Sequence, residues 1–171
     1  MTSPHAEGER EWFDEEPVRF ECTQCGACCT GSSGFVLFSR KEGERIARRL
    51  GISYAEFHER YTHETPAGRS LRESVVIDEH GRTMHDCIFL DRHTLPGRLV
   101  CSLYEDRPTQ CRTFPYWPEN VSSRRAWRAV ARACEGIGRG NFVPSSEIRI
   151  QRATQDQARR DPGRLEPDRD A

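Results

Sequence analysis

Short apolar runs bounded by turn residues predict several strands in this chain. Residues 71–78 and 82–90 flank the turn Glu79-His80-Gly81, so we expect them to pair as two neighbouring strands. Residues 34–38 and 98–101 are shorter runs of the same kind. The pattern therefore predicts a small amount of sheet made of short strands.

Two helices are expected to begin with the same polar signature. Ser39-Arg40-Lys41-Glu42 and Ser53-Tyr54-Ala55-Glu56 both match a capping box, in which serine and glutamate satisfy free backbone amides of the first turn. Gly51 would end the first of these helices as a left-handed residue. A short helix is also expected to begin at Asp106-Arg107-Pro108. The two capped helices would cover about residues 40–50 and 54–63. Two further helices are expected at about residues 123–133 and 145–160.

The two ends of the chain differ in composition from its middle. Residues 1–17 are acidic, polar and interrupted by proline and glycine, and residues 161–171 are similar, so both are expected to be disordered tails. Residues 18–160 would form one domain, the usual outcome for a chain of 171 residues. With short strands and helices interspersed, the expected fold is a small α+β domain.

The composition leaves little apolar material for a core. Hydrophobic residues make up 35% of the chain, cysteines included, and charged residues make up 31%. A bound metal could supply the missing stability, because metal-binding free energy becomes folding free energy when the unfolded chain has no site. The net charge of −1 gives no field that would attract nucleic acid or an anionic membrane surface.

The sequence has the features of neither a secretory signal nor a membrane span. Its first residues lack a cationic start followed by an apolar run, and runs such as residues 87–90 are far too short to cross a bilayer. We therefore expect a cytoplasmic protein, in which thiols stay reduced. This location argues against a disulfide scaffold.

Cysteine shows the clearest pattern of any residue type. Four cysteines form a C-x2-C-x2-C-C run, and four more follow singly beside turn-forming or aromatic residues. Thiolates are strong, soft ligands for zinc and iron, and eight of them suffice for two four-cysteine sites. Any one of the four single cysteines would be interpreted as a small buried hydrophobic residue. Together with the run, the four indicate a pool of metal ligands. The candidate metal ligands are Cys22, Cys25, Cys28, Cys29, Cys87, Cys101, Cys111 and Cys134.

The adjacent pair Cys28 and Cys29 is difficult to place on one ion. Neighbouring side chains point to opposite faces of an extended chain and apart around a helix, so these thiols are expected to serve different metals, unless one is not a ligand. The metal stays open, since four thiolates suit zinc and iron–sulfur clusters about equally. The arginines Arg107, Arg112 and Arg132 could offset the negative charge of either centre, or could be ordinary surface residues.

The cysteines and their neighbours resemble a known family, the YkgJ-type cysteine-cluster proteins. The resemblance covers about residues 20–140, with Glu135 as a departure where members often carry proline. It implies a zinc- or iron-chelating domain and an iron–sulfur oxidoreductase role, and flagellin lysine N-methylases carry a similar cluster. The residues that carry it are Cys22-Thr23-Gln24-Cys25-Gly26-Ala27-Cys28-Cys29, Cys87-Ile88-Phe89-Leu90, Cys101-Ser102-Leu103-Tyr104, Arg107-Pro108-Thr109-Gln110-Cys111-Arg112-Thr113-Phe114-Pro115 and Cys134-Glu135-Gly136-Ile137-Gly138.

These observations favour a cytoplasmic metal-binding protein with one or two cysteine-ligated centres, holding zinc or an iron–sulfur cluster and redox-active in the second case. One alternative is a zinc-stabilised interaction module without catalysis, and another is a cluster-dependent protein methyl-transfer enzyme similar to flagellin lysine N-methylase. The sequence contains no P-loop, dinucleotide-binding turn or nucleophile elbow. Catalytic residues and a protein partner are therefore not assigned, and enzymatic activity is left open.

Overall fold

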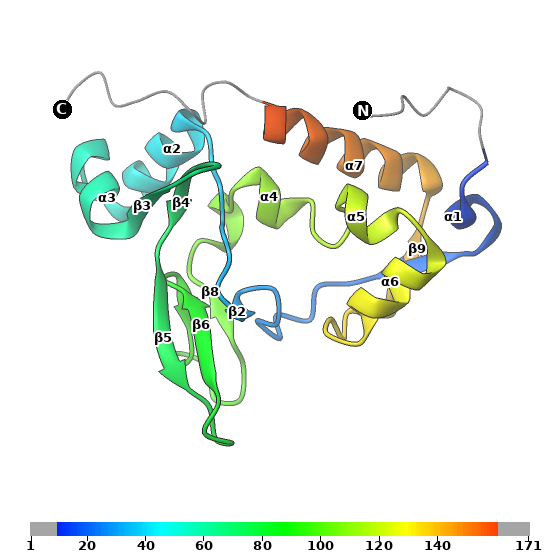
Figure 1. Ribbon diagram of the computed structural model, residues 1–171, viewed down its shortest axis with the longest axis horizontal. Helices are drawn as coiled ribbons and strands as arrows, with labels where there is room; N and C mark the ends of the chain where they lie inside the picture. The colour runs from blue at the N-terminus through cyan, green and yellow to red at the C-terminus, as the bar shows by residue number, and fades with distance from the viewer. Residues whose placement is uncertain (1–9, 161–171) are drawn as a thin grey trace.

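The computed structural model describes residues 10–160, and its first long helix has the predicted caps (Figure 1). This helix, α2, spans Arg40–Leu50. The Ser39 hydroxyl accepts a hydrogen bond from the Glu42 amide, and the Glu42 carboxylate accepts one from the Ser39 amide. Gly51 ends the helix at φ 70°, a left-handed conformation that glycine adopts without strain.

The next elements complete the first of two apolar cores. Helix α3, Tyr54–Tyr61, packs beside α2 and is shorter than predicted, because the chain turns into a strand at Thr62. Strands β3, Thr62–Thr65, and β4, Gly68–Leu71, then form an antiparallel hairpin that the sequence pattern did not indicate. We call the cluster that these elements enclose the first core. It consists of Phe38, Ile46, Ala47, Phe57, Leu71, Phe89 and Leu103, with Cys87 and Cys101 packed against it.

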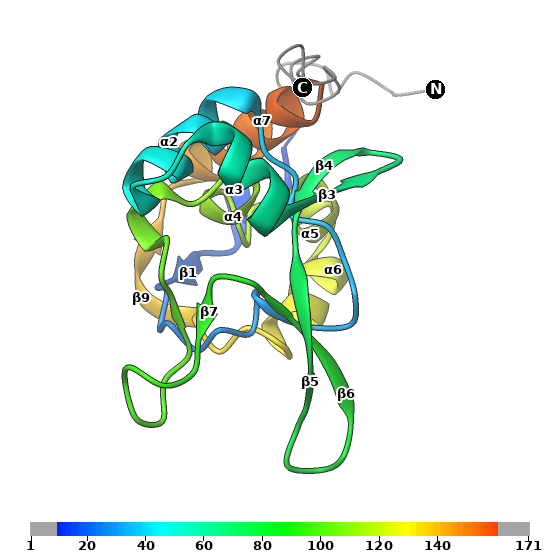
Figure 2. The same cartoon turned by 90° about the vertical axis from the view of Figure 1, so that its left-hand side faces the viewer.

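A small sheet projects below this core. Strands β5, Glu73–Ile77, and β6, Thr83–Cys87, form the predicted hairpin, and β2, Thr30–Gly31, adds to the other edge of β6. Strands β7, Leu90–Asp91, and β8, Val100–Cys101, pair separately. The views in Figures 1 and 2 agree that the β5–β6 hairpin extends away from the helices.

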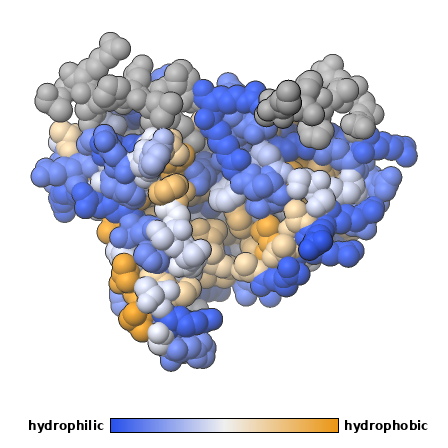
Figure 3. Space-filling model, viewed as in Figure 1, coloured by the Kyte–Doolittle hydropathy of each residue, from blue (hydrophilic) through white to orange (hydrophobic). Residues whose placement is uncertain are grey.

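The region around this hairpin has less regular sheet than predicted. Residues 34–38 make only one bridge, between Leu37 and Ser70, in place of the expected strand. On β5, Val75 and Ile77 each expose 65% of their surface, and Figure 3 shows apolar surface on the projecting hairpin. The outer part of the hairpin therefore adds little to either core.

The second core joins the two ends of the described chain. Strand β1 pairs antiparallel with β9, with Val18 opposite Val143, so segments far apart in sequence lie side by side. Helices α6 and α7 were predicted, whereas the other elements were not. The elements are α1 (Trp12–Glu15), β1 (Val18–Phe20), α5 (Pro118–Val121), α6 (Arg124–Ala131), β9 (Ile137–Val143) and α7 (Ser145–Arg160). The buried residues of the second core are Phe13, Val18, Tyr116, Val121, Trp127 and Ile148.

Part of the predicted N-terminal tail is folded. Residues 10–17 contain α1, in which Phe13 is only 4% exposed and the Trp12 indole donates to a backbone carbonyl of α5. The acidic composition of this segment predicted disorder, but its two aromatic side chains reach the second core. Residues 1–9 and the predicted C-terminal tail, 161–171, lie outside the described residues.

Helix α4, Thr109–Arg112, connects the two cores. At its first residue, the Thr109 amide and hydroxyl each donate a hydrogen bond of 2.6 Å to the Glu42 carboxylate on α2. Just beyond its end, the Thr113 hydroxyl donates to the Gln155 side-chain oxygen on α7, at 3.0 Å. The fold is α+β as predicted, and none of the helices described here is long and apolar enough to cross a membrane.

Candidate metal centre

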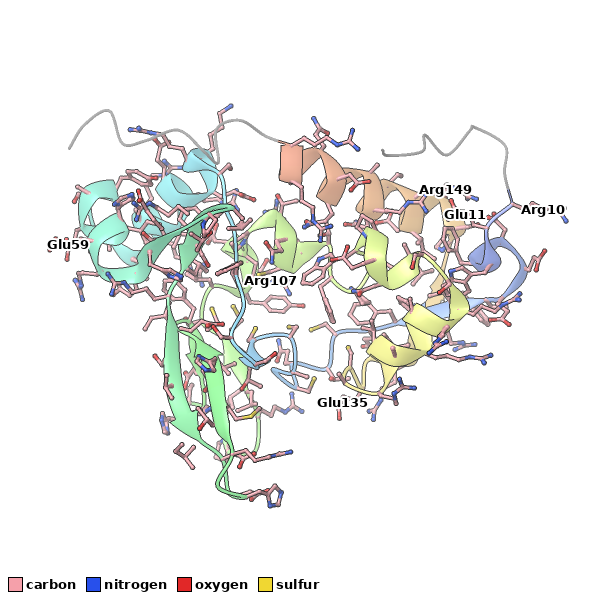
Figure 4. All side chains as sticks on the ribbon, in the orientation of Figure 1. Arg10, Glu11, Glu59, Arg107, Glu135 and Arg149 are labelled. Atoms are coloured by element: carbon pink, nitrogen blue, oxygen red, sulfur yellow. The ribbon has the colours of Figure 1, made fainter. Side chains whose placement is uncertain are left out.

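A cavity of about 180 Å³ lies between the two cores, and all eight cysteines line it. Figure 4 shows sulfur atoms gathered in the middle of the molecule, below the labelled Arg107. Four of the cysteines come from the N-terminal run, and the others come from β6, β8, α4 and the turn after α6. All eight are free thiols. The fold therefore brings the four single cysteines to the run, although they are distant from it in sequence.

Backbone pairing fixes three of the cysteines on the side of the first core. The Cys87 amide donates to the Cys29 carbonyl at 2.8 Å, next to the pairing of β2 with β6. Cys101 pairs with Leu90 on the β7–β8 ladder, a few residues after Cys87. Strand geometry thus holds Cys29, Cys87 and Cys101 near one another through main-chain contacts.

A second main-chain contact places Cys134 beside the start of the run. The Glu21 amide donates to the Gly136 carbonyl at 3.1 Å, where β1 meets β9. A Cβ at Gly136 would lie 2.3 Å from the Glu21 carbonyl oxygen, so only glycine permits this approach. The turn after α6 therefore holds Cys134 against the segment that leads into Cys22.

The cysteine run itself turns at Gly26. This residue has φ 72°, and the Cys29 amide donates back to its carbonyl at 2.8 Å. A Cβ added at Gly26 would lie 2.3 Å from Leu99 Cβ, so the loop packs closely on the segment before β8. Gly26 thus makes a tight turn inside the cysteine run, and Leu99 fixes the position of this turn.

The adjacent cysteines Cys28 and Cys29 do not point apart. Their sulfur atoms are 3.6 Å apart. A tetrahedral site with zinc–sulfur bonds of about 2.3 Å separates its sulfurs by about 3.8 Å. The expectation that these neighbouring side chains point apart is therefore wrong, because the turn at Gly26 bends the backbone enough to bring both thiols to the same cavity.

The thiols line one cavity, but they do not surround a single metal position. Within residues 10–160, no three histidine, cysteine, aspartate or glutamate side chains stand in an arrangement that could hold a metal ion. The thiols therefore share one cavity without forming a preformed coordination site.

Comparison with known families agrees with this geometry. Residues 21–135 match the family described as "CxxCxxCC: Putative zinc- or iron-chelating domain". The chain belongs to this family. The matched range covers about two thirds of the chain and includes all eight cysteines of the CxxCxxCC domain. No solved structure matches the chain.

The close contact between Cys28 and Cys29 shifts the pKa values of the two thiols in opposite directions. The contact with Cys29 lowers the pKa of Cys28 to about 7, against the effect of burial and with help from the charge of Arg107. The same contact, together with burial, raises the pKa of Cys29. Cys28 is thus the thiol of this pair that gives up its proton at neutral pH, which is the form that binds metal.

Most of the other thiols resist ionisation. Burial raises the pKa of Cys87 to about 11 and that of Cys111 well above its usual value, and neighbouring thiolates add to both effects. Burial also raises the pKa of Cys101 and Cys134. A bound cation would reverse this preference, because it stabilises thiolates directly.

Arg107 acts on three of the thiols. Its charge lowers the pKa of Cys28 and opposes the effect of burial on Cys101 and Cys111. The guanidinium is held in place by stacking on the Tyr104 ring, 3.9 Å from the centroid, and by donating to the Tyr104 carbonyl. Of the other two arginines considered from the sequence, one lines the cavity (Arg112) and the other does not (Arg132).

Two polar residues of the site were not identified from the sequence as contributors. The Thr23 hydroxyl is buried without a hydrogen-bond partner and lines the cavity between Cys22 and Cys25. Tyr104, at the start of the 3-10 turn Tyr104–Asp106, places its hydroxyl against the Cys22 thiol. An unpaired buried donor is costly unless it meets an acceptor, and a metal-bound sulfur would be one. The donor set and this hydroxyl therefore fit zinc or an iron–sulfur cluster.

Proposed function

We propose that this CxxCxxCC domain binds zinc or an iron–sulfur cluster through its eight cysteines, in one or two centres. The observation that carries the proposal is that all eight thiols line one cavity, although they come from five separate parts of the chain. Four-thiolate coordination is typical of both kinds of centre. Zinc would supply a structural cross-link there, and an iron–sulfur cluster would supply one-electron redox chemistry.

The chain's own residues prepare the cavity for such a centre. Apolar side chains exclude water from one wall, including Leu71, Phe89 and Leu103 of the first core. Arg107 places one positive charge against the thiolates, and the Thr23 hydroxyl offers a hydrogen bond to a sulfur. Low polarity and hydrogen bonds to sulfur are the means by which proteins adjust the potential of a cluster.

The position of the cavity also favours a second candidate, a zinc-stabilised interaction module. The cysteines come from both sides of the seam between the first and second cores, so a bound ion would hold the cores together. In this role the metal contributes folding free energy and takes part in no reaction. The exposed thiols of the described chain are free, which supports a reducing compartment such as the cytoplasm for either candidate.

Metal analysis of protein purified without oxygen distinguishes the two candidates. A brown protein that contains iron and sulfide and has thiolate-to-iron charge-transfer absorption would support the redox role. A colourless protein with stoichiometric zinc would support the structural role and contradict the redox role. Protein that binds neither metal, even after reconstitution under reducing conditions, would contradict the proposed function itself.

A matched pair of variants tests the ligand assignment. The variant Cys22→Ser/Cys25→Ser should lose at least one metal equivalent, whereas His85→Ala/His93→Ala should keep the full content. Both histidines lie outside the cavity wall, and His85 instead faces Glu73 at 3.6 Å. Equal metal loss in the two variants would show that the cavity thiols are not the binding groups.

A further inference from the structure

The backbone contacts of the cavity suggest a division among the eight thiols. On one side, the Cys87 amide bonds to the Cys29 carbonyl, and the β7–β8 pair holds Cys101 close by. Cys111 comes from α4, and this helix is held to α2 on the first-core side by the hydrogen bonds from Thr109 to Glu42. These four cysteines therefore form one neighbourhood beside the first core.

The remaining cysteines form a second neighbourhood beside the second core. The contact between Glu21 and Gly136 holds Cys134 against the start of the run, which supplies Cys22 and Cys25. A surface hollow is lined by Cys22, Cys25 and Glu135, so these two cysteines lie beside the residue that follows Cys134. The C-x2-C-x2-C spacing then places Cys28 one step further along the same loop.

The two neighbourhoods meet at the pair Cys28 and Cys29. Their sulfurs are 3.6 Å apart, yet Cys29 is tied to Cys87 through the backbone while Cys28 belongs to the loop that approaches Cys134. We propose that the cavity holds two metal positions side by side, one bound by Cys29, Cys87, Cys101 and Cys111 and the other by Cys22, Cys25, Cys28 and Cys134. This division rests on the proposed function, and it assigns each thiol to one of two sites.

Pairs of substitutions test the division, with Co²⁺ as an anaerobic spectroscopic probe for tetrahedral thiolate sites. The wild-type protein should bind two Co²⁺, each with the absorption of a four-thiolate site. Two substitutions within one group, Cys87→Ser/Cys111→Ser or Cys22→Ser/Cys25→Ser, should leave one intact four-thiolate Co²⁺. Substitutions in different groups, Cys111→Ser/Cys134→Ser, should leave none. All three variants remove two thiols, so they are matched in thiol number.

The outcomes separate the division from the proposed function. If the mixed variant keeps one intact four-thiolate Co²⁺, or if a same-group variant keeps none while its circular dichroism remains native, the division is wrong. A wild-type protein that binds only one Co²⁺ also overturns it. A wild-type protein that binds no Co²⁺, zinc or iron contradicts the proposed function instead.

The pair at the junction gives a second test that does not depend on folding of the double variants. Two Co²⁺ ions whose ligands include sulfurs 3.6 Å apart lie close together, so their spins should interact. The paramagnetic resonance signal should grow with the first equivalent of Co²⁺ and change in shape or intensity per ion with the second. Two independent, unchanged signals would show that the positions are not adjacent.

Discussion

The two cores of this protein are assembled from the chain in different ways. The first core comes from one continuous segment, from Phe38 to Leu103. The second core joins Phe13 and Val18 near one end of the described chain to residues from 116 to 148 near the other. Closing so long a loop costs conformational entropy before any contact repays it. The second core therefore depends more on whatever holds the two ends together.

Besides the β1–β9 pairing and the buried side chains of the second core, ion pairs join the two ends of the described chain. Arg152 forms a two-pronged ion pair with Glu11, and Arg149 pairs with Asp14. The more exposed of the two, Arg149 with Asp14, is worth about 1 kcal/mol or less. By contrast, Cys134 and the run at residues 22–29 reach across the seam into the cavity. A metal bound there would be the strongest single link between the cores.

The largest expected effect is therefore that of removing the metal. Structural zinc sites contribute about 10–16 kcal/mol of binding free energy in small domains, so chelation should destabilise the protein severely. We expect the metal-bound protein to unfold in one cooperative transition. Without metal, we expect the second core to unfold before the first. Chemical denaturation monitored by tryptophan fluorescence measures the unfolding of the second core, because Trp12 and Trp127 both pack there. An unchanged transition after complete metal removal would contradict the link.

A matched pair of core substitutions compares the two cores directly. Ile46 in α2 is fully buried in the first core, and Ile148 in α7 is 1% exposed in the second. Replacing either by alanine should cost about 2–5 kcal/mol of unfolding free energy, because each leaves a cavity. In metal-bound protein both variants should unfold in a single transition.

Without metal the same two variants should behave differently. Ile148→Ala should lower the midpoint of the second core alone, and Ile46→Ala should affect the first core. Hydrogen exchange of the α2 and α7 amides measures the two separately. Equal loss of protection in both helices for both variants would show that the cores are coupled without metal.

The same contrast explains which parts of the fold could be predicted from the sequence. The caps of α2 and the hairpin of β5 with β6 depend on residues within a few positions of one another, and these were predicted. Strand β1 has three residues, and β9 contains two glycines, so neither shows an apolar period of its own. They form strands because they pair with each other across the whole chain, which local patterns do not report.

The candidate site shows the same limit at smaller scale. Cysteine type and spacing predicted the ligand pool, and the pool does line one cavity. The spacing did not predict the close approach of Cys28 to Cys29, because this depends on the left-handed turn at Gly26 and its packing on Leu99. Nor did it identify Thr23, whose hydroxyl matters only because burial removes its other partners.

Thr23 offers a smaller and more specific test on the second-core side of the cavity. Thr23→Val keeps the shape of the side chain but removes the hydroxyl that we expect to bond to a metal-bound sulfur. Losing such a supporting hydrogen bond typically costs 10- to 100-fold in metal affinity. Competition with a coloured chelator measures the affinity, and Thr23→Ser serves as the control that retains the hydroxyl. Equal affinity for the valine and serine variants would show that the hydroxyl has no role.

The smallest expected effect concerns Glu42, which ties the first core to α4 and so to Cys111. Burial opposes its ionisation, but hydrogen bonds from Ser39 and Thr109 outweigh burial and lower its pKa below the usual 4.5. A carboxylate with a lowered pKa stabilises the fold above about pH 4.5, and this contribution is lost as the pH falls through the lowered value. Glu42→Gln should therefore cost about 1 kcal/mol at pH 7, because its hydrogen bonds are no longer assisted by charge.

The pH dependence of Glu42→Gln decides whether charge is the reason for its effect. In metal-free protein the stabilities of wild type and variant should converge as the pH falls through the lowered pKa of Glu42, because the wild-type carboxyl then also becomes neutral. Glu44→Gln is the control, since Glu44 lies on the same helix in a half-exposed pair with Arg40 and should change stability by less than about 0.5 kcal/mol. A difference between wild type and Glu42→Gln that persists after the Glu42 carboxyl has been titrated to its neutral form would instead indicate a packing effect. In that case α4 would be held to the first core by shape, and the charge of Glu42 would play no part in positioning Cys111.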